Sequence, residues 1–274
     1  MGIKDIGKDN FIKNRAILEM LEDIGAYHSD LAGYGASDIE KTNVVWILAG
    51  WKLDVIKRPK YGPKIHIKTW GRDMSKAVTY RDFELYSNNN ELCAIATSKW
   101  VLVSTKTGRI TKITEEIAHK YMPEDKSVYD KKEIEKIDLP EESEYTKKIK
   151  YAVNRRDIDI NGHMHNLYYL DLAYEALPEE VYNQRPYDSV QIQYKKEIKI
   201  NKIIRIVGLC DEGKTQIDIN NNKYYIVKNI APFCYWSYMM PLFTDNVELY
   251  NTNTFVKSFL SKIDESKIFN FEVR

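Results

Sequence analysis

The chain has 274 residues, 43% hydrophobic and 30% charged, which is typical of a globular protein long enough for two ordinary domains. Its 41 basic and 40 acidic residues nearly cancel, so no overall charge favours nucleic acid or an anionic membrane, and a charged partner must meet a local patch. The three cysteines, Cys93, Cys210 and Cys234, are widely separated and lack metal-ligand spacing, so we expect unpaired thiols, no metal and no cofactor.

The opening stretch "MGIKDIGKDNFIKN" has no apolar core and no small-residue cleavage site of the kind that marks a signal peptide. No run along the chain approaches the roughly 18 apolar residues that a membrane span needs. We therefore expect a cytoplasmic protein without a membrane span.

The first half predicts one helix followed by strands. In residues 11–35, Ile17, Leu21, Ile24 and His28 recur at helical spacing, and Gly33 and Gly35 are stop signals. The following segments are rich in β-branched and aromatic residues and are separated by the turns "YGP", "SNNNE" and "TGR", which suit antiparallel hairpins: 43–58, 64–73, 77–87 and 91–105.

The second half repeats this order after a charged, proline-bracketed segment, residues 122–148, that we interpret as a surface linker. A short strand over 148–158 precedes a helix from about 163 to 177, whose buried stripe is Leu167, Leu170, Tyr174 and Leu177 and which Pro178 ends. Strands are predicted in 189–200, 202–213 and 214–228. A helix that buries its stripe on its own antiparallel sheet, twice over, is an α+β fold.

Acid-base side chains gather at the entry to this second helix. Asp159, Asn161 and His163 alternate in "DIDINGH", so an extended segment would point all three to one side. Gly162 permits a sharp turn, and unpaired N–H groups of the first helical turn would then suit an oxyanion. The plainer alternative is that Asp159 or Asn161 only caps the helix. His165 is expected at the surface.

The string Asp-x-Asn-x-His-x-x-Asn in "DINGHMHNLYYLDLAYEALP" resembles the motif of the acyl-acyl carrier protein (acyl-ACP) thioesterases. Three further segments are similar to that family: "VQIQYKKEI", "NVVWILAGWKLDVIKRPKYGPKIHIKTW" and "KWVLVSTKTGRITKITEEI". The resemblance covers most of residues 11–227. It implies two tandem hot-dog domains, each a long helix wrapped by an antiparallel sheet: residues 1–135 would bind the acyl chain without a catalytic histidine, and residues 145–274 would be catalytic. The segment from about 229 departs from the family's closing strand.

Carried onto this chain, the family's catalytic positions are Asp159, Asn161, His163 and Glu197. Many plant members have a cysteine after the glutamate, but Ile198 stands here, so the expected nucleophile is water. Glu197, together with His163, would be the general base, Asn161 would position water or carbonyl, and Asp159 would orient its neighbours. Which of Glu197 and His163 takes the proton first stays open. Without the resemblance, Glu197 reads as a solvated strand residue beside lysines.

The resemblance also implies an acyl carrier protein with a phosphopantetheine-linked acyl chain as partner, with no nucleic acid and no membrane span, and it is compatible with a homodimer. Two lysine-rich clusters would suit an acidic carrier: Lys57, Arg58, Lys60 and Lys64, or Lys195, Lys196 and Lys199. Four tryptophans, Trp46, Trp51, Trp70 and Trp100, are candidates for an acyl slot or for ordinary core. Two other functions remain alternatives: an acyl-CoA thioesterase and a non-catalytic acyl-binding module.

Overall fold

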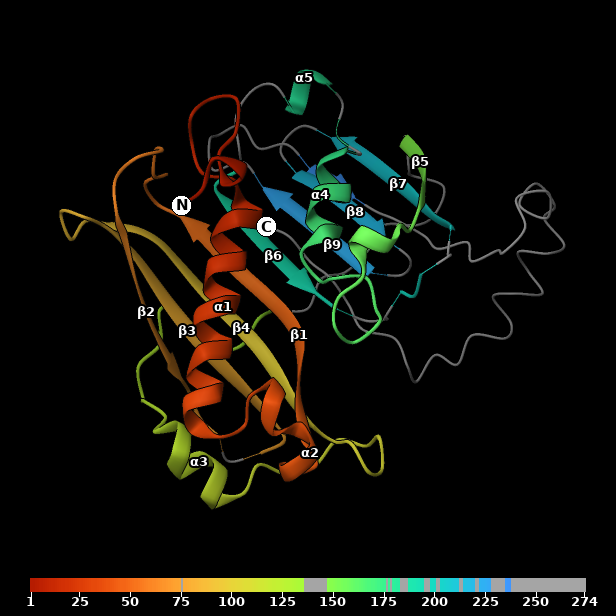
Figure 1. The fold of residues 1–274 in the computed structure, drawn as a ribbon. Helices are drawn as coiled ribbons and strands as arrows, with labels where there is room; N and C mark the ends of the chain where they lie inside the picture. Colours follow the sequence, from red (N-terminus) through yellow and green to blue (C-terminus); the bar gives the residue numbers. More distant parts are fainter. Residues whose placement is uncertain are drawn as a thin grey trace, which may run out of the picture. The chain divides into compact units, whose positions relative to one another are not determined.

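The computed structural model describes residues 1–74, 76–135, 147–175, 177, 179–182, 187–194, 198–200, 203–211, 214–219, 222–227 and 235–237, and beyond residue 200 it describes the backbone alone. The chain divides into two compact units, Met1–Lys136 and Ile137–Arg274. Each unit combines helices with an antiparallel sheet (Figure 1). The expected α+β class is confirmed.

The first unit contains a four-stranded sheet. Its strands are β1 (Val44–Val55), β2 (Ile65–Gly71), β3 (Val78–Ser87) and β4 (Leu92–Ser104), in the order β2-β3-β4-β1, and every neighbouring pair is antiparallel. The "YGP" hairpin expected between the first two strands is wrong, because β1 pairs with β4 and the intervening segment crosses to the opposite edge. Turn residues predict a change of direction, but the strand partner depends on contacts distant in sequence.

The helix α1 (Asn14–Ala32) lies along one face of this sheet (Figure 1). Ile17 and Leu21 are at most 1% exposed, which confirms the helical stripe at these positions. Gly33 ends the helix in the left-handed conformation, with φ of 76°. The core that α1 covers includes Trp51 and Phe83, whose ring centroids are 5.3 Å apart.

The C-terminal half of α1 contacts the buried guanidinium group of Arg81 on β3. A Cβ atom added at Gly25 would lie 3.3 Å from Cδ of Arg81, so glycine makes room for this side chain. Nη1 of Arg81 donates to Nδ1 of His28 at 2.8 Å and to Oγ1 of Thr69 at 3.1 Å. Burial lowers the pKa of Arg81 to about 10, and burial followed by the Arg81 charge lowers the pKa of His28. His28 is therefore a neutral hydrogen-bond partner within the fold.

Residues 123–135, called the strap below, cover the opposite face of the sheet. Side chains alternate along a strand, so Arg81 points to α1 while its neighbour Asp82 points to the strap, where Oδ2 accepts from the Val128 N–H at 2.9 Å. Nη1 of Arg72 donates to Oγ of Ser127 at 2.5 Å, and its Nε lies 3.3 Å from Oδ1 of Asp82. This half of the expected surface linker is thus bound to the first sheet.

Four further short helices belong to the first unit: η1 (Ile3–Asp5), η2 (Ala36–Asp38), α2 (Ile39–Thr42) and α3 (Glu115–Tyr121). The hydroxyl of Tyr121, at the end of α3, accepts from Nε1 of Trp46 at 2.8 Å. Nε1 of Trp70 donates to the Lys126 carbonyl in the strap at 2.9 Å, and Nε1 of Trp100 donates to Oγ of Ser98 at 2.7 Å. These indoles have structural partners, and an acyl slot lined by them stays a prediction.

The second unit repeats the topology of the first. Its strands are β5 (Lys147–Ala152), β6 (Ser189–Gln193), β7 (Ile203–Asp211), β8 (Lys214–Ile219), β9 (Asn222–Val227) and β10 (Tyr235–Ser237). The strand after the helix, β6, pairs with β9, as β1 pairs with β4, and β9, β8, β7 and β5 follow in antiparallel order. The predicted strand 214–228 is therefore two antiparallel strands, β8 and β9. Except for β10, the segment from about 229 lies outside the described residues.

The helices of this unit are η4 (Arg155–Asp157), α4 (Tyr168–Glu175) and α5 (Glu179–Tyr182). Leu167 and Leu170 are fully buried, as the predicted stripe requires. The expected start near residue 163 is wrong, since α4 begins at Tyr168. The residues between are held by a different local structure, which forms the candidate site.

Candidate functional site

A tight hairpin holds three of the four predicted site residues. The Asp159 N–H donates to the His163 carbonyl at 2.8 Å, the Gly162 N–H donates to the Asp159 carbonyl at 3.1 Å, and Gly162 has φ of 77°. These features define a three-residue hairpin loop with a left-handed glycine at its end. The expected extended alternation of Asp159, Asn161 and His163 is wrong, because main-chain hydrogen bonds close the segment into a turn.

The carboxylate of Asp159 stabilises this turn. Its Oδ1 accepts from the Asn161 N–H at 2.8 Å and from the His163 N–H at 3.2 Å. Aspartate commonly holds turns in this way, by accepting from the backbone two residues further on. The side chain therefore organises the loop that carries Asn161 and His163, and it does not cap α4.

His165 organises the entry to α4. Its main-chain N–H donates to the Asp157 carbonyl at 2.7 Å, and its ring Nδ1 accepts from the Leu167 N–H at 3.3 Å. The expected surface position is only partly right, since the side chain is half-buried. Because the first turn of α4 begins five residues after His163, the proposed oxyanion donors do not follow directly on the histidine.

Residues 198 and 199, which are distant in sequence, contact the strand of the hairpin that contains His163 and Met164. The Met164 N–H donates to the Ile198 carbonyl at 2.7 Å, and His163 forms an isolated antiparallel bridge with Lys199. This contact places His163 opposite the stretch of chain that follows Glu197. Glu197, Lys195 and Lys196 lie outside the described residues, so the expected meeting of Glu197 with His163 stays a prediction.

The first unit contains the same hairpin at the entry to α1. The Gly7 N–H donates to the Phe11 carbonyl at 2.8 Å, and the Ile12 N–H donates to the Pro59 carbonyl at 3.0 Å. The isolated bridges also correspond: Ile6 with Ile12 matches Ile158 with Met164, and Phe11 with Lys60 matches His163 with Lys199. The two units thus share one local structure at this position.

The side chains of the two hairpins differ. Gly7 stands in the place of Asp159, Asp9 in that of Asn161 and Phe11 in that of His163. The first hairpin therefore lacks an imidazole, as expected for a domain without a catalytic histidine. By the same register, Arg58 corresponds in sequence to Glu197, and its Nη1 donates to the Ile12 carbonyl at 2.9 Å and to Oδ1 of Asn14 at 2.7 Å.

Two residues missed by the sequence reasoning, Asp157 and Tyr151, lie at the base of the second hairpin. Oδ2 of Asp157 accepts from the Asn154 N–H and from the Tyr151 hydroxyl, each at 2.7 Å. Burial, followed by this hydrogen bond, raises the pKa of Tyr151. The string "NRRD" is a capping-box signal for a short helix and was available from the sequence. Among the described residues, no group of three His, Cys, Asp or Glu side chains is placed to hold a metal ion.

Comparison with solved structures defines the class of fold. The protein is similar to the 12:0-ACP thioesterase from Umbellularia californica, with a TM-score of 0.71, 18% identity, and coverage of 88% of this chain and 95% of the other. An acyl-ACP thioesterase from Bacteroides thetaiotaomicron gives a TM-score of 0.69 at 17% identity, covering 85% of this chain and 92% of the other. These likenesses establish the tandem hot-dog fold.

The chain belongs to the acyl-ACP thioesterase family. The family's N-terminal domain model matches residues 1–121, and its C-terminal domain model matches residues 140–230. Oleoyl-acyl carrier protein thioesterase 1, chloroplastic, of Arabidopsis thaliana is 22% identical over 218 residues, which are 73% of this chain and 59% of the relative. Palmitoyl-acyl carrier protein thioesterase, chloroplastic, of Cuphea hookeriana is 26% identical over 217 residues, 76% of this chain and 52% of the relative. The chain thus spans between half and two thirds of these relatives.

Proposed function

We propose that this protein hydrolyses acyl-ACP thioesters to free fatty acid and carrier protein. The observation that carries the proposal is the match of both halves of the chain to the two domains of one thioesterase family. The His163 hairpin supports it, since main-chain contacts hold this half-buried histidine residue beside the segment that follows Glu197.

In the proposed reaction, water attacks the thioester carbonyl while Glu197, together with His163, takes one proton from it. The C–S bond then breaks, and this proton passes to the departing phosphopantetheine thiolate. Asn161 positions the water or the carbonyl, and Asp159 keeps the loop closed through its two main-chain contacts. No thiol competes as nucleophile among the described side chains, because Cys93 is 2% exposed and burial raises its pKa.

A panel of acyl-ACP substrates of graded chain length tests this function directly. We expect release of free fatty acid from at least one of them, measured by mass spectrometry, at a kcat/KM well above that for the same acyl group on CoA. A wide preference for CoA would identify an acyl-CoA thioesterase instead. Binding without release, unchanged by Glu197→Ala, would identify a non-catalytic module.

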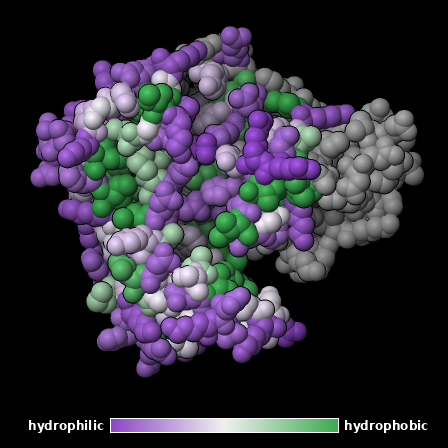
Figure 2. Space-filling view, in the orientation of Figure 1, coloured by the Kyte–Doolittle hydropathy of each residue, from purple (hydrophilic) through white to green (hydrophobic). Residues whose placement is uncertain are grey.

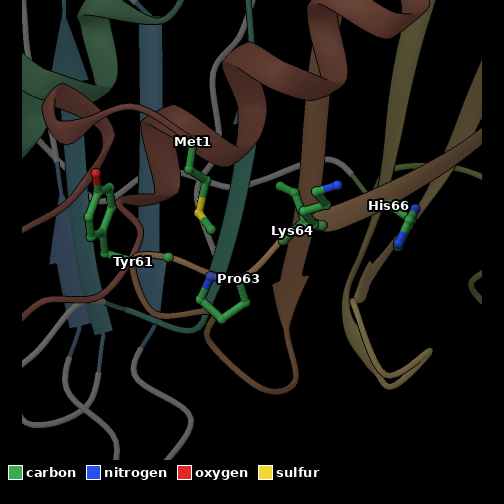
Figure 3. Close-up of a pocket in the computed structure, with 7 residues that line it drawn as sticks. Met1, Tyr61, Pro63, Lys64 and His66 are labelled. Atoms are coloured by element: carbon green, nitrogen blue, oxygen red, sulfur yellow. The ribbon is translucent and has the colours of Figure 1, made fainter.

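The partner of the proposed reaction is an acidic carrier protein, and a basic loop of the first unit suits it. Residues 56–64, here called the basic loop, contain no acidic residue. The last four of them, residues 61–64, line a hollow of about 370 Å³ together with Met1, Ile65 and His66 (Figure 3). Lys64 and His66 are exposed there. Not all cations of the predicted cluster are equally available: Arg58 is bound to Ile12 and Asn14, and Nζ of Lys57 lies 2.7 Å from Glu91.

Exchanging Lys60 and Lys64 for glutamate is expected to raise the KM for acyl-ACP several-fold and to leave kcat unchanged, because rim charges act mainly on encounter with the partner. The salt dependence of kcat/KM should also weaken. Hydrolysis of the same acyl group on pantetheine, which has no acidic protein attached, should not change. Lys106→Glu combined with Arg109→Glu, at exposed positions of the same unit, is the control with an equal change of charge. An equal rise in KM for the control would refute docking at the basic loop.

The described helices include none that is long and apolar enough to cross a membrane. Figure 2, drawn in the orientation of Figure 1, shows mainly hydrophilic residues on the described part of the visible face, with hydrophobic residues in smaller patches. The cytoplasmic location and a homodimer remain predictions.

A further inference from the structure

We propose that Asp157 is a positioning residue for the His163 hairpin, acting through its carboxylate on the segment before the loop and through its main-chain carbonyl on the segment after it. This inference rests on the proposed function, because it concerns the placement of the histidine that is expected to react. Asp157 touches neither substrate nor water in this role. It holds the loop on which the reacting side chains are carried.

The carboxylate of Asp157 holds the segment that precedes the hairpin. It accepts from the Asn154 N–H at 2.7 Å, which closes the short helix η4, and from the Tyr151 hydroxyl at 2.7 Å, which ties that helix to β5. Asp157 is 5% exposed, and a carboxylate that accepts two hydrogen bonds in a buried place is strongly held. The residue after Asp157 is Ile158, where the hairpin begins.

The main-chain carbonyl of Asp157 holds the segment that follows the hairpin. Its carbonyl accepts from the His165 N–H at 2.7 Å, two residues after His163. Ile158 and Met164 form a bridge directly inside this contact. One residue therefore joins the segment before the loop to the segment after it, and a shift of Asp157 is transmitted to both ends of the hairpin.

The first unit provides an internal comparison. Oδ2 of Asp5 accepts from the Gly2 N–H at 2.6 Å, and the Asp5 carbonyl accepts from the Lys13 N–H at 2.9 Å. Asp5 thus holds the Phe11 hairpin as Asp157 holds the His163 hairpin, although the side chains on the two loops differ. The aspartate belongs to the frame of the loop, which explains why it is present where the imidazole is absent.

The test compares Asp157→Ala with Asp5→Ala in the full chain. We expect Asp157→Ala to lower kcat about 10- to 100-fold with little change in KM, because displacement of a reacting group by about 1 Å costs rates of this order. Asp5→Ala removes the corresponding carboxylate contact from the Phe11 hairpin and should leave kcat unchanged. Asp157→Asn retains an oxygen acceptor and should restore most of the rate. Tyr151→Phe, which removes one hydroxyl, should lower kcat about threefold to tenfold.

Amide hydrogen exchange of residues 158–165 provides a readout that does not depend on activity. Faster exchange there in Asp157→Ala and Tyr151→Phe, with the rest of the unit protected, is the expected result. Equal kcat per folded molecule in wild type, Asp157→Ala and Tyr151→Phe would overturn the proposal, as would unchanged exchange. If the wild type hydrolyses no thioester, the proposed function fails, and exchange alone then decides whether Asp157 holds the loop.

Discussion

His163→Ala is expected to lower kcat for acyl-ACP hydrolysis by about 10²- to 10⁴-fold, the usual contribution of a positioned acid-base group. The fold should survive, because the hairpin is closed by the main chain of residue 163 and by Oδ1 of Asp159. Steady-state kinetics on the most active acyl-ACP substrate, with circular dichroism to verify folding, measures the effect.

Cys93→Ser is the matched control, and it should retain the kcat of the wild type because the thiol is buried in the first unit. Asp159→Asn keeps an oxygen acceptor for the loop and should lose less activity than Asp159→Ala. Retention of kcat within about threefold in His163→Ala would contradict a role for the imidazole in proton transfer.

Arg72→Met is expected to reduce the free energy of unfolding by about 3–5 kcal/mol, the usual cost of removing one partner of a buried ion pair. The carboxylate of Asp82 is fully buried, and Oγ1 of Thr97 and the Val128 N–H donate to it at 2.6 and 2.9 Å. Without the guanidinium its charge has no counterion among these contacts, and the strap loses the bonds from Arg72 to Ser127 and to the Lys132 carbonyl. Urea unfolding followed by tryptophan fluorescence measures the loss.

The pH dependence of this loss provides a second check. Burial raises the pKa of Asp82, so its carboxyl group is protonated more readily in the folded state than in the unfolded state, and stability is lost as the pH rises from the unfolded-state pKa through the folded-state pKa. Removing Arg72 increases this cost at neutral pH and leaves it small near the pKa of an unfolded aspartate, about 4. The deficit of Arg72→Met should therefore shrink in acid, and Arg72→Met/Asp82→Asn should recover part of the stability at pH 7. A deficit independent of pH would exclude the buried charge as its cause.

Patterns within a few residues of sequence predicted part of this architecture well. The stripe of Ile17 and Leu21 indicated α1, and Gly33 indicated its end, because both depend on local geometry. The second helix was placed too early, since the hydrogen bonds of Asp159 and His165 compete with helical bonds before Tyr168. Short polar side chains next to a glycine favour a turn over either an extended strand or a helix.

Features that depend on distant partners were not available from local patterns. The pairing of β1 with β4 and the binding of the strap to Arg72 and Asp82 join residues separated by some 40 positions or more. The pattern of the sequence itself indicated Asp159, Asn161 and His163 as a polar cluster, which the structure places in one loop, whereas the choice of Glu197 depends on the family resemblance. The string "NRRD" is a local signal for Asp157, whereas Tyr151 is identified only by its hydrogen bond to that residue.

The duplicated hairpin separates the task of holding a loop from the task of reacting. The same main-chain bonds support Phe11 in one unit and His163 in the other. Because these bonds involve the main chain, the side chain at this position can be replaced while the hairpin keeps its structure. One hairpin of such a pair can therefore carry a reacting side chain while the other carries a different one, and both keep the same main-chain structure.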